Sequence, residues 1–145
     1  MDEPAWRIAG TVAGTLADAP RRVRTPSSRD IKRITGIVRR IEAEPEDEHP
    51  LTRLAGDAAM SPYHFLRTFR QVVGMAPHQY VLRTRLHRAA LRLRRSPEEI
   101  AEIAFGAGFN DLSTFNRRFR RVMGVSPSVY RAGGSRRKNQ VGQVL

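Results

Sequence analysis

The chain of 145 residues contains no cysteine. It can therefore form no disulfide, no thiol nucleophile and no cysteine-ligated zinc site, which excludes the zinc-finger proteins. Long apolar runs are also missing, since none approaches the roughly 20 residues that span a bilayer. The N-terminus begins with acidic residues, Asp2 and Glu3, and lacks the basic and then apolar order of a signal peptide. We expect a cytoplasmic protein that contacts no membrane.

Acidic residues are scarce and unevenly placed. Asp and Glu number 14 against 26 Lys and Arg, a net charge of +12, and no acid occurs between residues 61 and 97 or after residue 111. A protein that is merely soluble intersperses the two signs, so this segregation indicates a polyanionic partner such as DNA, RNA or an anionic membrane face. Part of the arginine excess is explained as well by the base composition of the genome as by a polyanionic partner. Five acids cluster in one loop, which we interpret as solubilising or as a weak partner of nearby arginines: Glu42, Glu44, Glu46, Asp47 and Glu48.

Signals of catalysis and of cofactor binding are absent from the sequence as well. There is no nucleophile paired with a base, no glycine-rich phosphate loop and no carboxylate pair. The histidines lack the spacing of three or four residues that would bring two of them onto one helix face. We predict no enzymatic activity, no cofactor and no metal site. The histidines are His49, His64, His78 and His87.

The sequence repeats itself at a distance of about 50 residues. When residues 65–80 are laid on residues 115–130, eight of the sixteen positions are identical. Upstream the offset becomes 49, so the second copy has gained one residue at a turn. The chain therefore uses one supersecondary unit twice. The identical residues, in the first copy, are Phe65, Arg67, Phe69, Arg70, Val72, Gly74, Pro77 and Tyr80.

In the first copy the unit is a short helix, a tight turn and a second helix. Ser61 followed by Pro62 is typical of a helix start, and Gly74 suits the left-handed residue that ends one. Helix, turn and helix form the helix-turn-helix, whose second helix enters the major groove of DNA. Ala59 stands where the second copy has Gly108. If that turn needs a positive φ, alanine costs on the order of 1 kcal/mol and the first turn is looser.

The second copy has the same signals in different residues. Ser96-Pro97-Glu98-Glu99 predicts a helix start with a serine cap and a capping-box acid. A turn follows at Ala107-Gly108, Asn110 is predicted to cap the next helix, and that helix ends at Gly124. In both copies the helical period predicts an inward and an outward face. The inward residues are Phe65, Phe69, Val72, Phe115, Phe119 and Val122, and the outward residues are Tyr63, Leu66, Arg67, Arg70, Ser113, Asn116, Arg117 and Arg120.

Five segments follow from these patterns. Residues 1–29 read as a flexible leader, with Asp30 capping a helix after it, and residues 30–76 form the first unit. Residues 77–95 form a linker helix about 28 Å long, close to the roughly 34 Å between successive major-groove faces. Its arginine side is a solvated face with one or two phosphate contacts. Residues 96–132 form the second unit, and residues 133–145 a disordered basic tail.

The run Ala104-Phe105-Gly106-Ala107-Gly108-Phe109 resembles the signature of the AraC/XylS family of transcription regulators. The resemblance continues through Ser113, Phe115, Arg117, Phe119, Arg120, Gly124, Pro127 and Tyr130, and covers about residues 31–132. It implies an all-α domain of about seven helices, in which two helix-turn-helix units enter adjacent major-groove segments. Most members carry a ligand-sensing or dimerising domain, for which residues 1–29 are too short. Regulation by an effector is therefore not carried over, and we expect a monomer on DNA unless a domain outside this sequence dimerises it.

The resemblance also implies which side chains meet DNA. Tyr63 is left with two interpretations, since it either packs locally or touches a thymine methyl group. The residues expected to face bases are Tyr63, Leu66, Arg67, Ser113, Asn116 and Arg117, with Leu112 at the margin. The residues expected at phosphates are Arg70, Arg120, Ser61 and Asn110.

The function we expect is sequence-specific binding of double-stranded DNA that regulates transcription, in a protein associated with the nucleoid. One alternative is an architectural protein that bends DNA with little base specificity. Another is a module that docks RNA polymerase through the acidic loop.

Overall fold

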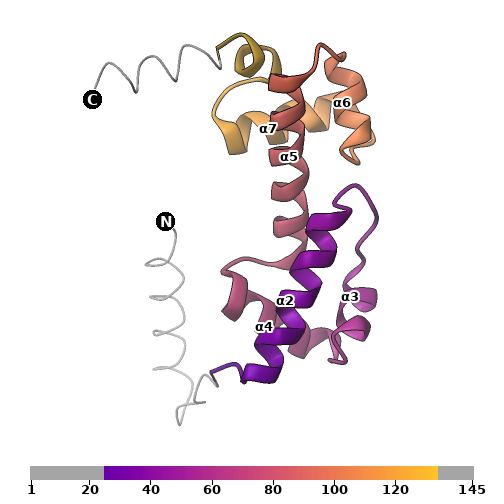
Figure 1. Cartoon of the computed structure of the whole chain (residues 1–145), viewed down its shortest axis with the longest axis vertical. Coiled ribbons are helices and arrows are strands. Elements are labelled where there is room, and N and C mark those ends of the chain that lie inside the picture. The colour runs from indigo at the N-terminus through magenta and orange to yellow at the C-terminus, as the bar shows by residue number, and fades with distance from the viewer. Residues whose placement is uncertain (1–24, 134–145) are drawn as a thin grey trace, which may run out of the picture.

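The computed structural model describes residues 25–133, and every regular element within them is a helix (Figure 1). The leader and the tail predicted for the chain ends lie mostly outside these residues. The predicted all-α fold, with two helix-turn-helix units joined by a long helix, is confirmed. The helices are α2 (Ser28–Ala43), α3 (Leu51–Asp57), α4 (Pro62–Val73), α5 (Pro77–Arg95), α6 (Ile100–Gly106) and α7 (Leu112–Met123), followed by a helix over residues 127–133.

Helix α5 connects two separate hydrophobic cores. One of its ends packs on α2 and α4 and the other on α6 and α7, so the two units lie at opposite ends of one rod (Figure 1). Val81 of α5 belongs to the first core, whereas Leu86 and Leu93 belong to the second. The part of the chain that the structure describes has no helix that is both long and apolar enough to cross a bilayer.

The predicted inward faces are largely confirmed. Four phenylalanines are fully buried, and their rings pack in pairs within each unit: Phe65, Phe69, Phe115 and Phe119. Val122 was predicted to pack inward, and this prediction was wrong, because 40% of it is exposed.

The ends of α4 and α7 follow the predicted rules. Ser61 accepts a hydrogen bond from the backbone N–H of His64 at 3.2 Å, and Pro62 opens α4. Gly74 and Gly124 end the two second helices with φ of 90° and 85°, which a side chain would disfavour.

Two predicted caps were wrong by one to three residues. Helix α2 is capped by Ser27, which accepts from the N–H of Asp30 at 3.1 Å. Asp30 instead sits in the first turn, where a carboxylate faces the positive end of the helix dipole. The cap of α7 is Asp111, which accepts from the N–H of Thr114 at 2.7 Å, and Asn110 lies outside the helix.

The start predicted at Ser96 was also wrong. Ser96 ends α5, with its N–H bonded to the carbonyl of Arg92 at 2.9 Å, and α6 begins only at Ile100. Glu99, which stands three residues after Ser96 where a capping-box acid would, is instead the residue before α6 and makes no side-chain cap hydrogen bond, and Arg92 binds its neighbour Glu98 at 2.8 Å. An ion pair at the end of the preceding helix thus replaces the expected cap.

The two tight turns share one backbone geometry. Ala59 has φ of +56° and Gly108 has φ of +97°, so the turn does require a positive φ. Among residues 25–133, Ala59 is the only residue other than glycine with this conformation. The looseness expected of the first turn stays a prediction; the hydrogen bond from Met60 N–H to the Ala55 carbonyl closes this turn at 2.9 Å.

Candidate nucleic-acid interface

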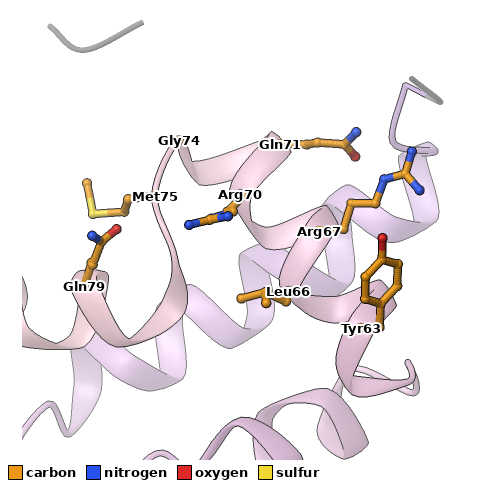
Figure 2. A pocket seen from close by; sticks show the side chains of 8 residues that line it. All are labelled: Tyr63, Leu66, Arg67, Arg70, Gln71, Gly74, Met75 and Gln79. Carbon is orange, nitrogen blue, oxygen red and sulfur yellow. The ribbon is translucent and has the colours of Figure 1, made fainter. Parts of the chain in front are cut away.

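The outer face of α4 forms the wall of a groove of about 540 Å³ (Figure 2). Tyr63 is 73% exposed at the start of the helix, and Leu66 is half-buried beside it. The structure brings these two side chains together with Arg67 and Arg70, as the helical period predicted. Ser61 lies at the N-terminal end of the same helix, outside the groove. The groove is lined by Tyr63, Leu66, Arg67, Arg70, Gln71, Gly74, Met75 and Gln79.

A second groove, of about 500 Å³, lies along α7 in the other unit. Asn116, Arg117 and Arg120 line it from the helix face that the repeat predicted, with Leu112 at its start. Ser113 is exposed but does not line the groove, and neither does Asn110. The groove is lined by Ile100, Leu112, Asn116, Arg117, Arg120, Ser126, Pro127 and Ser128.

Sequence reasoning missed the far wall of each groove. In the first unit that wall is the segment from Gly74 to Gln79, and in the second it is residues 126–128. The glycine that ends each second helix turns the chain back against it. Because both glycines and the prolines after them recur in the repeat, the repeat could have identified both walls.

The two grooves offer related chemistry. Each holds two arginines at equivalent repeat positions, Arg67 with Arg70 and Arg117 with Arg120. A guanidinium donates two hydrogen bonds to guanine O6 and N7 or to a phosphate, and an asparagine such as Asn116 pairs with adenine. Apolar and aromatic groups contact the thymine methyl group. The faces can therefore contact both base edges and phosphates.

Among the described residues, the arginines that line the two grooves form no ion pair with an acidic side chain. Within residues 25–133 the ion pairs are Arg40 with Asp57, His64 with Asp30, and Arg92 with Glu98, all made by other side chains. Asp111 has a lowered pKa, chiefly because it accepts two hydrogen bonds from Thr114, with a smaller contribution from the charge of Arg117. Arg117 thus lies in the field of one acid.

Two arginines of the linker helix do not belong to the solvated face that was predicted. Arg85 donates to the carbonyls of Pro45 and Asp47, at 2.5 and 2.7 Å, and Arg88 donates to the carbonyl of Glu42. Burial lowers the pKa of Arg85, although the nearby carboxylates act against it. The acidic loop is therefore bound through its backbone carbonyls, which sequence patterns do not reveal.

Residues 54–133 match the model of a helix-turn-helix domain family. The HTH-type transcriptional regulator MtrA of Neisseria gonorrhoeae is 33% identical over 106 residues, which cover 73% of this chain and 35% of that protein. The chain spans about a third of the length of the first curated relatives it matches.

Two solved structures are similar over most of the described residues. The DNA-binding domain of the global transcriptional factor AdpA, in complex with a target DNA, is 31% identical with a TM-score of 0.67, covering 74% of this chain and 96% of that one. A transcriptional regulator with an AraC-type DNA-binding domain, from Chromobacterium violaceum, is 26% identical with a TM-score of 0.68 and the same coverage.

Proposed function

The chain belongs to the AraC/XylS family of helix-turn-helix proteins, and on this basis we propose that it binds double-stranded DNA sequence-specifically and so regulates transcription. One observation carries the proposal: two exposed helix faces, one on α4 and one on α7, present arginines at equivalent positions of the repeat. The similar domain of AdpA in complex with its target DNA supports it.

In this proposal α4 and α7 lie in adjacent segments of the major groove. Helix α5 has 19 residues, hence a length of about 28 Å, close to the roughly 34 Å between successive faces of one groove. The protein binds as a monomer because it carries both recognition helices itself. Docking of RNA polymerase and association with the nucleoid remain predictions.

The outward side chains divide into two proposed roles. Those on the first two turns of each outer face reach base edges, and those just before the helix or on its third turn hold phosphates. The proposed readers are Tyr63, Leu66, Arg67, Ser113, Asn116 and Arg117, with Leu112 at the margin. The proposed anchors are Arg70, Arg120, Ser61 and Asn110.

Selection from a random duplex library, followed by footprinting on the selected site, tests the function. We expect a motif in two parts and protection of about 20 base pairs, since two successive groove segments are occupied. Protection of a single half-turn site would contradict binding by both units. Binding that selects no motif would instead identify the architectural alternative, in which charge and DNA bending replace base reading.

A further inference from the structure

A loop of the first unit touches the turn of the second unit. The loop covers residues 44–49, between α2 and α3, and the turn is the one at Gly108 between α6 and α7 (Figure 1). A Cβ atom built on Gly108 would lie 3.0 Å from the carbonyl oxygen of Glu46 and 3.1 Å from the Cζ and Nε atoms of Arg85. We call this contact of loop 44–49, Arg85 and Gly108 the joint.

Arg85 is the centre of the joint. It lies on α5 between Val81, which packs in the first core, and Leu86, which packs in the second. Its guanidinium donates to two carbonyls of the loop, those of Pro45 and Asp47. One side chain therefore links the linker helix, the loop of the first unit and the turn of the second.

Further bonds hold the end of α2, which leads into the loop, against α5. The Tyr80 hydroxyl donates to Glu42 Oε2 at 3.1 Å, and Arg88 donates to the carbonyl of Glu42. Within the loop, His49 Nε2 lies 2.8 Å from the Glu44 carbonyl, and Pro45 is buried. The chain is thus bonded to α5 just before the loop and in the middle of the loop, which can therefore resist movement of the second unit toward it.

The two hydrophobic cores share no residue, so outside α5 the orientation of the units depends on such contacts. One extra base pair between two half-sites rotates the second by roughly 35° about the DNA axis, because a turn contains about 10 to 10.5 base pairs. Two rigidly held recognition helices tolerate such a rotation poorly, whereas two loosely held ones adapt to it.

We propose that Arg85 is a positioning residue that fixes the angle between α4 and α7 and thereby the half-site spacing that the protein accepts. This inference rests on the proposed function. Arginine suits the role because its planar fork donates to two carbonyls at once, which the single ammonium group of lysine cannot reproduce with the same geometry.

The experiment uses the full chain and the two-part site selected by the wild-type protein. Affinity is measured for that site, for the same site with one base pair added or removed between the halves, and for each half-site alone. We expect the wild type to prefer the selected spacing by about tenfold or more, and Arg85→Ala by about threefold or less. Arg85→Lys keeps the charge and most of the stem but is also expected to lose most of the preference.

Arg83→Ala is the matched control, since it removes the same charge from an exposed position on the same helix. It is expected to keep the spacing preference even if it weakens all sites. Unchanged half-site affinity shows that the Arg85 variants remain folded. Full spacing preference in both Arg85 variants would overturn the inference while leaving the function intact. A wild type that selects no two-part site would overturn the proposed function itself.

Discussion

Ala59 and Gly108 show how one backbone requirement is met by two residues. Both adopt a positive φ at equivalent places in the two turns, yet only glycine does so without a steric cost. The first unit therefore holds strain of on the order of 1 kcal/mol, which the hydrogen bond at Met60 and the packing of α3 on α4 offset.

Ala59→Gly is expected to stabilise the protein by about 0.5 to 1 kcal/mol, because relief of strain outweighs the added entropy of the unfolded chain. The converse change, Gly108→Ala, should destabilise it by about 1 to 2 kcal/mol, since it adds strain and a contact at 3.0 Å with the Glu46 carbonyl. Urea unfolding followed by circular dichroism measures both. Equal effects of the two changes in the same direction would contradict the strain assignment.

Arg67 and Arg117 are expected to read bases. Each lies on the exposed face of its helix, two residues before a buried phenylalanine, and each lines a groove. Changing either to alanine should weaken binding to the selected site and make variants at one base pair equivalent, a loss of about 1 to 3 kcal/mol of discrimination. Binding assays on all single-base variants of the site measure this.

The alternative for these arginines is a purely electrostatic role. Neither arginine forms an ion pair within residues 25–133, but each has one acid nearby: Asp30 lines a pocket together with Arg67, and Arg117 lies in the field of Asp111. Alanine variants that bind every sequence more weakly but keep the whole base preference would make both residues anchors.

At the scale of helices, the C-terminal end of α5 is held by residues from three segments. Glu98 accepts hydrogen bonds from Arg92 and Ser96, and Arg131 donates to the carbonyls of Leu93, Ser96 and Glu98. These bonds satisfy carbonyl groups at a helix end that would otherwise lack partners. They also connect the linker to the last helix, so the second unit depends on them.

This network predicts a pH-dependent stability. The hydrogen bonds from Arg92 and then from Ser96 lower the pKa of Glu98 below its usual value of 4.5. A carboxylate whose pKa is lower in the folded than in the unfolded protein stabilises the fold at any pH above its unfolded-state pKa. This stabilisation is lost as the pH falls through the folded-state pKa. Glu98→Gln should therefore have a lower Tm than the wild type at pH 7, with a gap that narrows below about pH 4.5. Glu99→Gln, one residue away and exposed, is the control. A gap that is the same at pH 3 and pH 7 would rule out this origin.

Local patterns predicted much of the helical architecture. Both helix-turn-helix units followed from the repeat, because apolar spacing and signals such as Ser61 and Gly74 act within a few residues of where they stand. The outer faces of α4 and α7 followed from the same periodicity. The start of α7 was misplaced because Asn110 and Asp111 are adjacent and both can cap a helix.

Contacts between distant segments could not be predicted in this way. Arg85 and Arg88 bind carbonyls 40 and 46 residues earlier in the chain, and a carbonyl partner leaves no trace in the residue type that carries it. The joint between the units could therefore not be predicted from the sequence. Ser96 failed as a predicted cap for a local reason, since its hydroxyl donates to the Arg92 carbonyl and to Glu98, only four and two residues away.

At the scale of the whole molecule, net charge and groove chemistry act together. The charge of +12 attracts a polyanion from any direction, and each of the two grooves holds a pair of arginines that form no ion pair within the described residues. In the proposed complex, long-range charge governs the approach to DNA, and the grooves govern the register on it.

The division between anchors and readers predicts how affinity responds to salt. Each phosphate neutralised contributes about −0.9 to the slope of log K against log salt concentration, because it releases condensed counterions. Arg70 and Arg120 lie one turn beyond Arg67 and Arg117 on the same helices, toward the helix ends, where the phosphate backbone borders the groove. Arg70→Ala and Arg120→Ala should each make the slope shallower by about 0.9, the double variant by about 1.8, and each should weaken binding to all sequences alike.

Affinities measured from low to moderate salt, on the selected site and on an unrelated duplex, test this division. Arg95→Ala removes one positive charge outside both grooves and is expected to leave the slope nearly unchanged. If Arg70→Ala or Arg120→Ala instead left the slope intact and relaxed the preference at one base pair, that arginine would be a reader. The surface that contacts bases would then extend one helical turn beyond Arg67 or Arg117.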